Sequence, residues 1–273
     1  GFENIRSITG GYFRAFSLHG TDATKEQQKG IIEFMKKEML YLKDSAAKMG
    51  IELSDLQLEK FDTYYEMLVE KNKVMNLTAI TELEEVVQKH FLDSISLIKV
   101  EKLNQDISII DLGTGAGFPG IPLKIAFPEL EICLADSLNK RVLFLNEVIE
   151  ELELKKISAV HGRAEELARQ KEYREQFDLC VSRAVANLST LSEYCLPFVK
   201  VGGKFISYKA NEVEEETKQA EHALEVLGGA CVDIQKFQLP DSEMNRAFVI
   251  IEKKKKTPAI YPRKAGTPSK KPL

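Results

Sequence analysis

A glycine-rich segment between two apolar runs holds the residues of this chain best suited to ligand binding. Residues 111–120 read DLGTGAGFPG, after the apolar run 107–110 and before the apolar stretch 121–127. This order predicts a strand, a tight loop and a helix. Gly113, Gly115 and Gly117 can bring bare backbone against a ligand, and Asp111 places a carboxylate at the strand end. The combination favours a nucleotide-like ligand that is cationic or carries hydroxyl groups.

The glycine spacing alone leaves two such ligands open. Gly115, Gly117 and Gly120 also satisfy the G-x-G-x-x-G spacing of dinucleotide-binding proteins. Against NAD, Pro119 lacks an N–H where a phosphate needs one, and Asp111 would repel a pyrophosphate. S-adenosylmethionine has no phosphate and carries a sulfonium and an ammonium, which the carboxylate attracts. We therefore favour S-adenosylmethionine over NAD; a glycine turn without any ligand is the third alternative.

A second carboxylate supports a nucleoside ligand of either kind. Residues 131–135 predict a short strand, and Asp136 ends it about 20 residues after the glycines. At this spacing an acidic side chain accepts hydrogen bonds from both ribose hydroxyls. The alternative is a solvated carboxylate at a strand end.

The composition is that of a globular protein. The 273 residues, 44% of them hydrophobic, suit one large domain, or a domain with an appendage. No apolar run is long enough for a membrane span, and no basic flank with an apolar core marks a secretory signal, so we expect a cytoplasmic protein without membrane contact. The cysteines, far apart and without a histidine cluster, make zinc and disulfides unexpected; they are Cys133, Cys180, Cys195 and Cys231.

Charge is segregated toward the C-terminus. Residues 253–273 hold eight Lys or Arg and no acid, whereas the other 252 residues hold 30 basic and 42 acidic side chains. A basic tail on an acidic body is either a solubilising end or an arm for a polyanion such as RNA. The turn-rich pieces Pro262-Arg263 and 265–268 favour a folded, specific contact.

The first 34 residues show no sustained periodicity and lack an initial methionine. Met35 begins a helical pattern, so we expect it to be the natural start, with 1–34 a translated leader or a non-native extension. Mass spectrometry of the natively expressed protein tests this expectation.

Residues 35–100 predict an N-terminal helical region. One helix runs to Met49, and capping boxes at 54–57 and 81–84 predict the starts of two more. On the last helix His90 and Asp93 are three residues apart and share a face. We interpret them as a structural pair that joins this helix to the next domain, with a substrate contact as the alternative.

Between 101 and 252 strands and helices alternate, which predicts an α/β domain with a parallel sheet covered on both faces. Ligands bind such sheets at the carboxyl ends of the strands, where Gly113, Asp136, Ala164, Glu165 and Arg183 fall. The predicted strands are 107–112, 131–135, 157–161, 177–182, 204–208, 230–237 and 246–252; the predicted helices are 121–127, 138–151, 188–198 and 212–227.

Seven ordered motifs from residue 74 onward resemble the bacterial small-subunit ribosomal RNA guanine-N7 methyltransferases, also called the glucose-inhibited division protein B family. The resemblance implies a class I S-adenosylmethionine-dependent methyltransferase fold, Rossmann-like with a seven-stranded, mostly parallel sheet, and one guanine of 16S ribosomal RNA as the acceptor. The motifs are VMNLTAI at 74–80, His90 with Asp93-Ser94, DLGTGAGFPGIPL at 111–123, KRVLFL at 140–145, GRAE at 162–165, SRA at 182–184 and YPRKAGTPSKKPL at 261–273.

The resemblance also implies roles for single residues. Gly113 and Phe118 line the donor pocket, Ala164 and Glu165 border the adenine, and Arg183 lies near the methionine end or the entering base. We add Gly115 and Asp136 to this donor set. Without the resemblance, Glu165 could equally be a helix-start carboxylate, and Arg183 a strand-end ion pair.

Methylation at guanine N7 needs little side-chain chemistry, because N7 already has a lone pair. Catalysis is then mostly a matter of aligning the donor and the acceptor. We expect no metal ion, and we assign no side chain firmly to catalysis. Arg183 and Arg141 are the candidates for holding RNA phosphates or the donor carboxylate.

We predict that five basic residues bind RNA. We also expect the protein to be a monomer whose partner is 16S ribosomal RNA or the small ribosomal subunit. A small-molecule methyltransferase, an NAD-dependent dehydrogenase and a non-catalytic RNA-binding module are the alternative functions. The selected residues are Arg141, Arg246, Arg263, Lys270 and Lys271.

Overall fold

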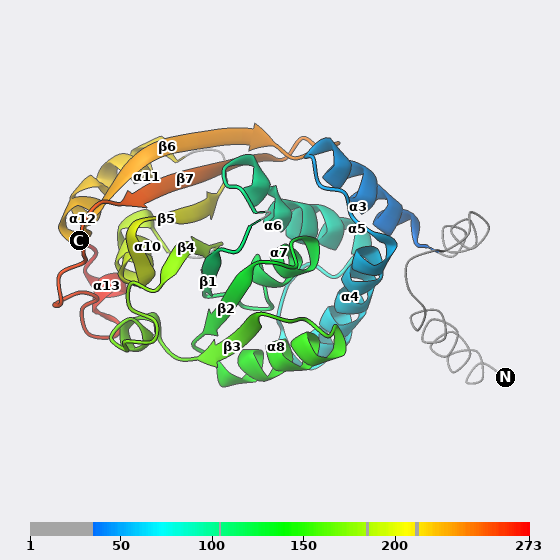
Figure 1. Cartoon of the computed structure of the whole chain (residues 1–273), viewed down its shortest axis with the longest axis horizontal. Helices are drawn as coiled ribbons and strands as arrows, with labels where there is room; N and C mark the ends of the chain where they lie inside the picture. The colour runs from blue at the N-terminus through cyan, green and yellow to red at the C-terminus, as the bar shows by residue number, and fades with distance from the viewer. Residues whose placement is uncertain (1–34, 104, 184–185, 211–212) are drawn as a thin grey trace. The chain divides into compact units, whose positions relative to one another are not determined.

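The computed structural model describes residues 35–273 except 104, 184–185 and 211–212. The expected leader, 1–34, lies outside the described residues. Residues Glu38–Leu273 form one compact unit, in which the helical region, the sheet and the basic C-terminal segment are packed together (Figure 1).

The centre of this unit is the expected seven-stranded, mostly parallel sheet, in the order β3-β2-β1-β4-β5-β7-β6. The first five strands of this order are parallel, and β7 pairs antiparallel with both β5 and β6. Because the chain order reverses at β1, a ligand crevice is expected at the carboxyl ends of β1 and its neighbours. The strands are β1 Ser108–Leu112, β2 Glu131–Asp136, β3 Ile157–His161, β4 Phe177–Ser182, β5 Val199–Lys209, β6 Gly229–Gln238 and β7 Asn245–Lys253.

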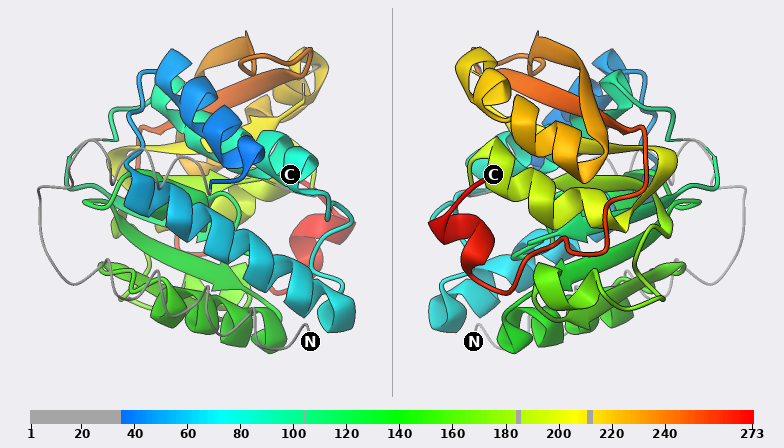
Figure 2. Two further views of the ribbon diagram at one scale, coloured as in Figure 1. Left: turned by 90° about the vertical axis from the view of Figure 1, so that its right-hand side faces the viewer. Right: turned by 90° about the vertical axis from the view of Figure 1, so that its left-hand side faces the viewer.

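Helices cover both faces of the sheet (Figure 2). One view shows α3, α4 and α8 in front of the sheet, and the opposite view shows α10 and α12. The helices are α3 Lys37–Lys48, α4 Asp55–Met75, α5 Leu83–Val86, α6 Asp93–Ile95, α7 Gly120–Ala126, α8 Asn139–Glu151, α9 Ala164–Leu167, α10 Leu188–Cys195, α11 Glu214–Gln219, α12 Glu221–Leu227 and α13 Thr267–Lys270, with a π-helical turn at Val87–Leu92 and 3-10 turns at Ser96–Lys99 and Leu196–Phe198.

One of the two predicted capping boxes is confirmed. Ser54 Oγ accepts from the Gln57 amide, and Gln57 Oε1 accepts from the Ser54 amide, at 3.2 and 2.9 Å. The box at 81–84 is wrong: the helix begins at Leu83 after an extended Glu82, which caps it without a side-chain hydrogen bond. Thr81 lies one residue too early, and its carbonyl accepts instead from the Tyr65 hydroxyl at 3.0 Å.

The long helix α4 packs against the glycine loop and holds it in place. Tyr64 is fully buried, and its hydroxyl donates to the carbonyl of Ala116 at 2.6 Å. A Cβ on Gly117 would lie 2.8 Å from the same hydroxyl, so the loop and the helix fit only with glycine at this position. The N-terminal helical region therefore positions the loop directly.

We expect Tyr64→Phe to lower the free energy of unfolding by about 1–3 kcal/mol, because it leaves a buried carbonyl without its donor. Tyr65→Phe is the matched control: its hydroxyl is only partly buried, so water can replace the lost bond and the loss should be smaller. Urea denaturation measures both, and equal losses would contradict the special role of Tyr64.

Candidate functional site

A cavity of about 280 Å³ opens at the carboxyl ends of β1 to β4. Four of the seven predicted donor residues line it: Gly113, Asp136, Ala164 and Glu165. The other three, Gly115, Phe118 and Arg183, do not line it; Gly115 is bonded to Asp136, while Phe118 and Arg183 belong to a separate cluster. The full lining is Leu112, Gly113, Ala135, Asp136, Ser137, Gly162, Arg163, Ala164, Glu165, Ser182, Ala186, Leu191, Tyr194, Gly266 and Ser269.

The glycines of the loop are needed for two different reasons. Gly113, Gly115 and Gly117 have φ angles of 72°, 63° and 109°, which other residues rarely adopt. A Cβ on Gly113 or Gly115 would meet no atom within 4 Å, whereas one on Gly117 would lie 2.6 Å from Ile121. Gly117 thus serves packing, while Gly113 leaves open space on the cavity side.

Asp111 is the anchor of this loop. It is fully buried, and its Oδ2 accepts from the Thr114 hydroxyl at 2.7 Å and from the Gly120 amide at 2.8 Å. Its Oδ1 is buried without a hydrogen-bond partner among the described residues. Burial raises the pKa of this carboxyl from 3.8 to about 6, although the two hydrogen bonds and the charge of Arg183 oppose the shift. A nearby cation would stabilise the ionised form.

Asp136 also holds the loop, from the end of the neighbouring strand. Its Oδ2 accepts from the Gly115 amide and its Oδ1 from the Leu138 amide, both at 2.9 Å. Arg141 lies 3.4 Å from Oδ2. Only 3% of Asp136 is exposed, so the alternative of a solvated strand end is wrong.

Glu165 forms a wall of the cavity at the start of α9. It is buried, and its Oε1 accepts from the amide of Gly266 at 3.0 Å. The C-terminal segment therefore reaches this wall, together with Ser269. Sequence reasoning placed neither Gly266 nor Ser269 at the donor pocket; the turn-rich composition of 261–269 was the available signal.

Arg183 and Phe118 lie in a cluster that ties the helical region to the strand ends. The guanidinium of Arg183 donates to Asp93 Oδ2, to the Lys89 carbonyl and to Nδ1 of His90, each at 3.0 Å. It also lies over the Phe118 ring, 5.1 Å from its centroid, and His90 stacks on that ring at 4.4 Å. His90 and Asp93 thus join their helix to the sheet domain, as the structural interpretation expects.

His90 is neutral in this cluster. Its Nδ1 lies 3.0 Å from the Arg183 guanidinium and 3.2 Å from the Lys89 carbonyl, and its Nε2 lies 3.0 Å from the Thr78 hydroxyl. Burial and the adjacent Arg183 lower the pKa of His90 from 6.5 to about 3. The His90 imidazole therefore carries no positive charge at neutral pH.

Two of the selected basic residues are engaged inside the protein. Arg246 Nε donates to Asp93 Oδ1 at 2.8 Å. Nε and Nη2 of Arg263 donate to the carboxylate of the fully buried Glu193, at 2.9 and 2.6 Å. Lys270 and Lys271 are exposed.

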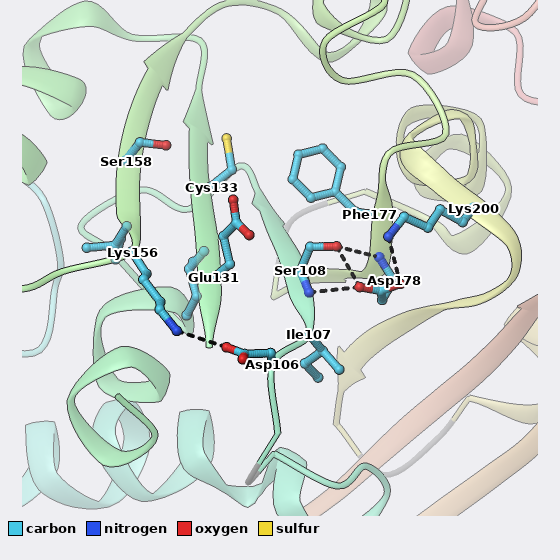
Figure 3. A pocket seen from close by; sticks show the side chains of 12 residues that line it. Asp106, Ile107, Ser108, Glu131, Cys133, Lys156, Ser158, Phe177, Asp178 and Lys200 are labelled. Atoms are coloured by element: carbon cyan, nitrogen blue, oxygen red, sulfur yellow. Dashed lines mark hydrogen bonds and ion pairs between the residues drawn. The ribbon is translucent and has the colours of Figure 1, made fainter. Parts of the chain in front are cut away.

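A larger cavity, about 620 Å³, lies at the opposite edge, where β1 to β4 begin (Figure 3). Four of its charged groups form two ion pairs, Lys156 with Asp106 and Lys200 with Asp178, both at 2.9 Å. Burial raises the pKa of the lining Cys133 thiol to about 11, so it is protonated at neutral pH. None of the predicted site residues line this cavity.

The described residues hold no group of three or more His, Cys, Asp or Glu that could bind a metal ion. Within the same residues, no helix has the length and apolarity needed to cross a membrane.

Comparison with known proteins decides the family. Residues 57–245 match the family model described as GidB, rRNA small subunit methyltransferase G. The chain is 58% identical over 225 residues to the ribosomal RNA small subunit methyltransferase G of Lachnoclostridium phytofermentans, covering 82% of this chain and 93% of that protein. The chain is 52% identical over 239 residues to the protein of the same name from Alkaliphilus metalliredigens, and the alignment covers 88% of this chain and 100% of that protein.

The chain belongs to the rRNA small subunit methyltransferase G family. The family match and the seven-stranded sheet with its strand-end cavity agree: this is a class I methyltransferase that uses S-adenosylmethionine. Membership of this family supports S-adenosylmethionine as the cofactor.

We expect Gly113→Val to abolish S-adenosylmethionine binding while the protein still folds. The new side chain would enter the open space on the cavity side, and valine at positive φ costs about 1–3 kcal/mol. Gly202→Val is the matched control, because Gly202 also has open space and a positive φ of 88° but lies on β5 outside the cavity. Calorimetry should find donor binding in the control alone; binding by folded Gly113→Val would refute the loop assignment.

We expect Asp111→Asn to gain stability over the parent as pH rises. Since the folded-state pKa of Asp111 exceeds its ordinary value, the parent loses stability between about pH 3.8 and 6 and does not recover it above. The loss is on the order of 3 kcal/mol, at about 1.4 kcal/mol per pKa unit. Urea denaturation at pH 5 and pH 8 without donor measures the difference between variant and parent, which should grow toward pH 8; a constant difference would contradict the buried charge.

Proposed function

We propose that this protein transfers the methyl group of S-adenosylmethionine to N7 of one guanine in 16S ribosomal RNA. The observation that carries the proposal is the family match over 57–245, which includes the glycine loop, Asp136, Glu165 and Arg183. The relatives at 52–58% identity carry names that specify small-subunit ribosomal RNA.

The residues around the cavity suit the parts of this donor. Glu165 can accept from the adenine amino group, and Asp136 can accept from the ribose hydroxyls. The loop around Gly113 receives the remainder, where Asp111 supplies negative charge for the sulfonium and ammonium groups. The unpartnered Oδ1 of Asp111 fits this assignment, because a buried carboxylate oxygen is stabilised by a cation.

The reaction requires alignment rather than acid–base catalysis. When bound, the donor supplies an activated methyl group: the carbon–sulfur bond breaks with its electron pair remaining on sulfur, and the N7 lone pair forms the new bond. The guanine becomes positively charged, and no proton has to move. The cavity lining contains neither cysteine nor histidine, in keeping with a transfer that needs no nucleophile or general base.

Three basic residues supply the contact with RNA. Arg141 is half-buried and lies 3.4 Å from the cavity-lining Asp136, and the exposed Lys270 and Lys271 belong to the C-terminal segment. We assign phosphate contacts to these three residues. Arg183, with its four neighbours, positions the loop side of the acceptor site, and Arg246 braces Asp93 within the same cluster. The partner is 16S ribosomal RNA, naked or in the small subunit, for a monomeric cytoplasmic enzyme.

The test is methyl transfer from labelled S-adenosylmethionine to small ribosomal subunits, and separately to naked 16S ribosomal RNA, from a strain that lacks the enzyme. Nucleoside mass spectrometry should find one new 7-methylguanosine per RNA. Methylation at another atom would refute the N7 assignment, and failure with both substrates would refute the RNA assignment.

We expect the double variant Lys270→Ala/Lys271→Ala to bind RNA more weakly and with a flatter salt dependence. Each lost phosphate contact should reduce the slope of log affinity against log salt by about 0.7–0.9. Lys255→Ala/Lys256→Ala removes the same charge from exposed residues outside the cavity and should leave the slope unchanged. RNA binding by filter assay across a salt series measures both. If the slope for Lys270→Ala/Lys271→Ala equals that of the parent, the C-terminal segment is only a solubilising end, and a small-molecule acceptor is favoured.

A further inference from the structure

The C-terminal segment 262–271 lies at one end of the donor cavity. Gly266 and Ser269 are part of its lining, although they are about 130 residues beyond Asp136 in the sequence. The amide of Gly266 donates to Oε1 of Glu165, the carboxylate at the adenine wall. The segment therefore bonds to a donor-site residue rather than only covering the surface.

Two contacts with α10 hold this segment in place. Arg263 forms a two-pronged ion pair with Glu193, which is 0% exposed, and its own amide donates to Glu193 Oε1 at 2.7 Å. The Thr190 hydroxyl donates to the carbonyl of the buried Pro268 at 3.1 Å. A buried carboxylate needs such a partner, because an unpaired charge there would be costly.

The segment's geometry gives Arg263 a task other than RNA binding. Its guanidinium is committed to Glu193 and to the carbonyl of Lys271, which closes the segment into a loop. That loop carries Gly266 to Glu165 and Ser269 to the cavity. Neither Arg263 nor Glu193 lines the cavity, so both act on it through the segment.

We propose that the segment 262–271 is part of the donor-binding site: Gly266 orients Glu165 for the adenine, Ser269 closes the adenine end, and Arg263 is the positioning residue that holds both in place. The proposal concerns donor binding, so it can fail or hold independently of whether ribosomal RNA is the acceptor.

Filling the cavity from this segment is the most direct test. Ser269 is exposed as well as lining, so Ser269→Tyr should leave the fold intact, yet weaken S-adenosylmethionine binding at least tenfold. Lys256→Tyr adds the same side chain at an exposed residue outside both the segment and the cavity, and should bind the donor like the parent. Calorimetry with S-adenosylmethionine, without RNA, measures both. Parental affinity in Ser269→Tyr would overturn the proposal.

Two substitutions test the role of Arg263: one removes its positive charge, and the other keeps the charge but replaces the planar guanidinium. Arg263→Ala should raise the KM for S-adenosylmethionine about tenfold with a much smaller change in kcat, because the donor wall is displaced while the aligned transfer is not. Arg263→Lys, which keeps the charge, should recover most of the affinity. Thermal unfolding is measured in parallel. If KM stays at the parental value in folded Arg263→Ala, or if kcat falls while KM does not, the positioning role is refuted.

Discussion

The site depends on one buried carboxylate. Asp111 bonds with a single oxygen to Thr114 and to Gly120, and so holds the loop at its first turn and at the start of α7. The amides of Gly113 and Thr114 donate to the carbonyl of Ala135, and the space where a Cβ of Gly113 would lie stays open. The cost is a desolvated charge whose second oxygen lacks a partner among the described residues. Burial of this carboxylate therefore lowers the stability of the protein at neutral pH.

Two further carboxylates extend the same design. Asp136 bonds to Gly115 from β2, and Glu165 bonds to Gly266 from α9, so each of these two cavity-lining acids also orders a backbone segment. On the other side of the loop, Arg183 connects His90 and Asp93 to the end of β4. The helical region, the sheet and the C-terminal segment thus meet at one place, which explains why the chain from Glu38 onward behaves as one unit.

The sequence was informative where a short pattern determines the local geometry. The glycine loop, the Ser54 capping box and the alternation of strands and helices predicted their elements to within a few residues, apart from β5, which begins five residues early. The Thr81 box failed because the helix begins one residue later, so that the cap position is occupied by Glu82, which makes no side-chain capping bond. Contacts between distant residues were not predictable. Lys253 counts as part of a basic tail in the sequence, yet it ends β7 fully buried, with its Nζ donating to the carbonyl of Leu196.

We expect the glycine loop to receive a cationic nucleoside without phosphate, and calorimetric titration of the whole protein can decide whether it does. S-adenosylmethionine and NAD are each titrated into the parent at pH 8, where Asp111 is ionised. S-adenosylmethionine should show saturable one-to-one binding, and NAD should not bind. Binding of NAD, or no binding of S-adenosylmethionine by folded protein, would contradict this expectation.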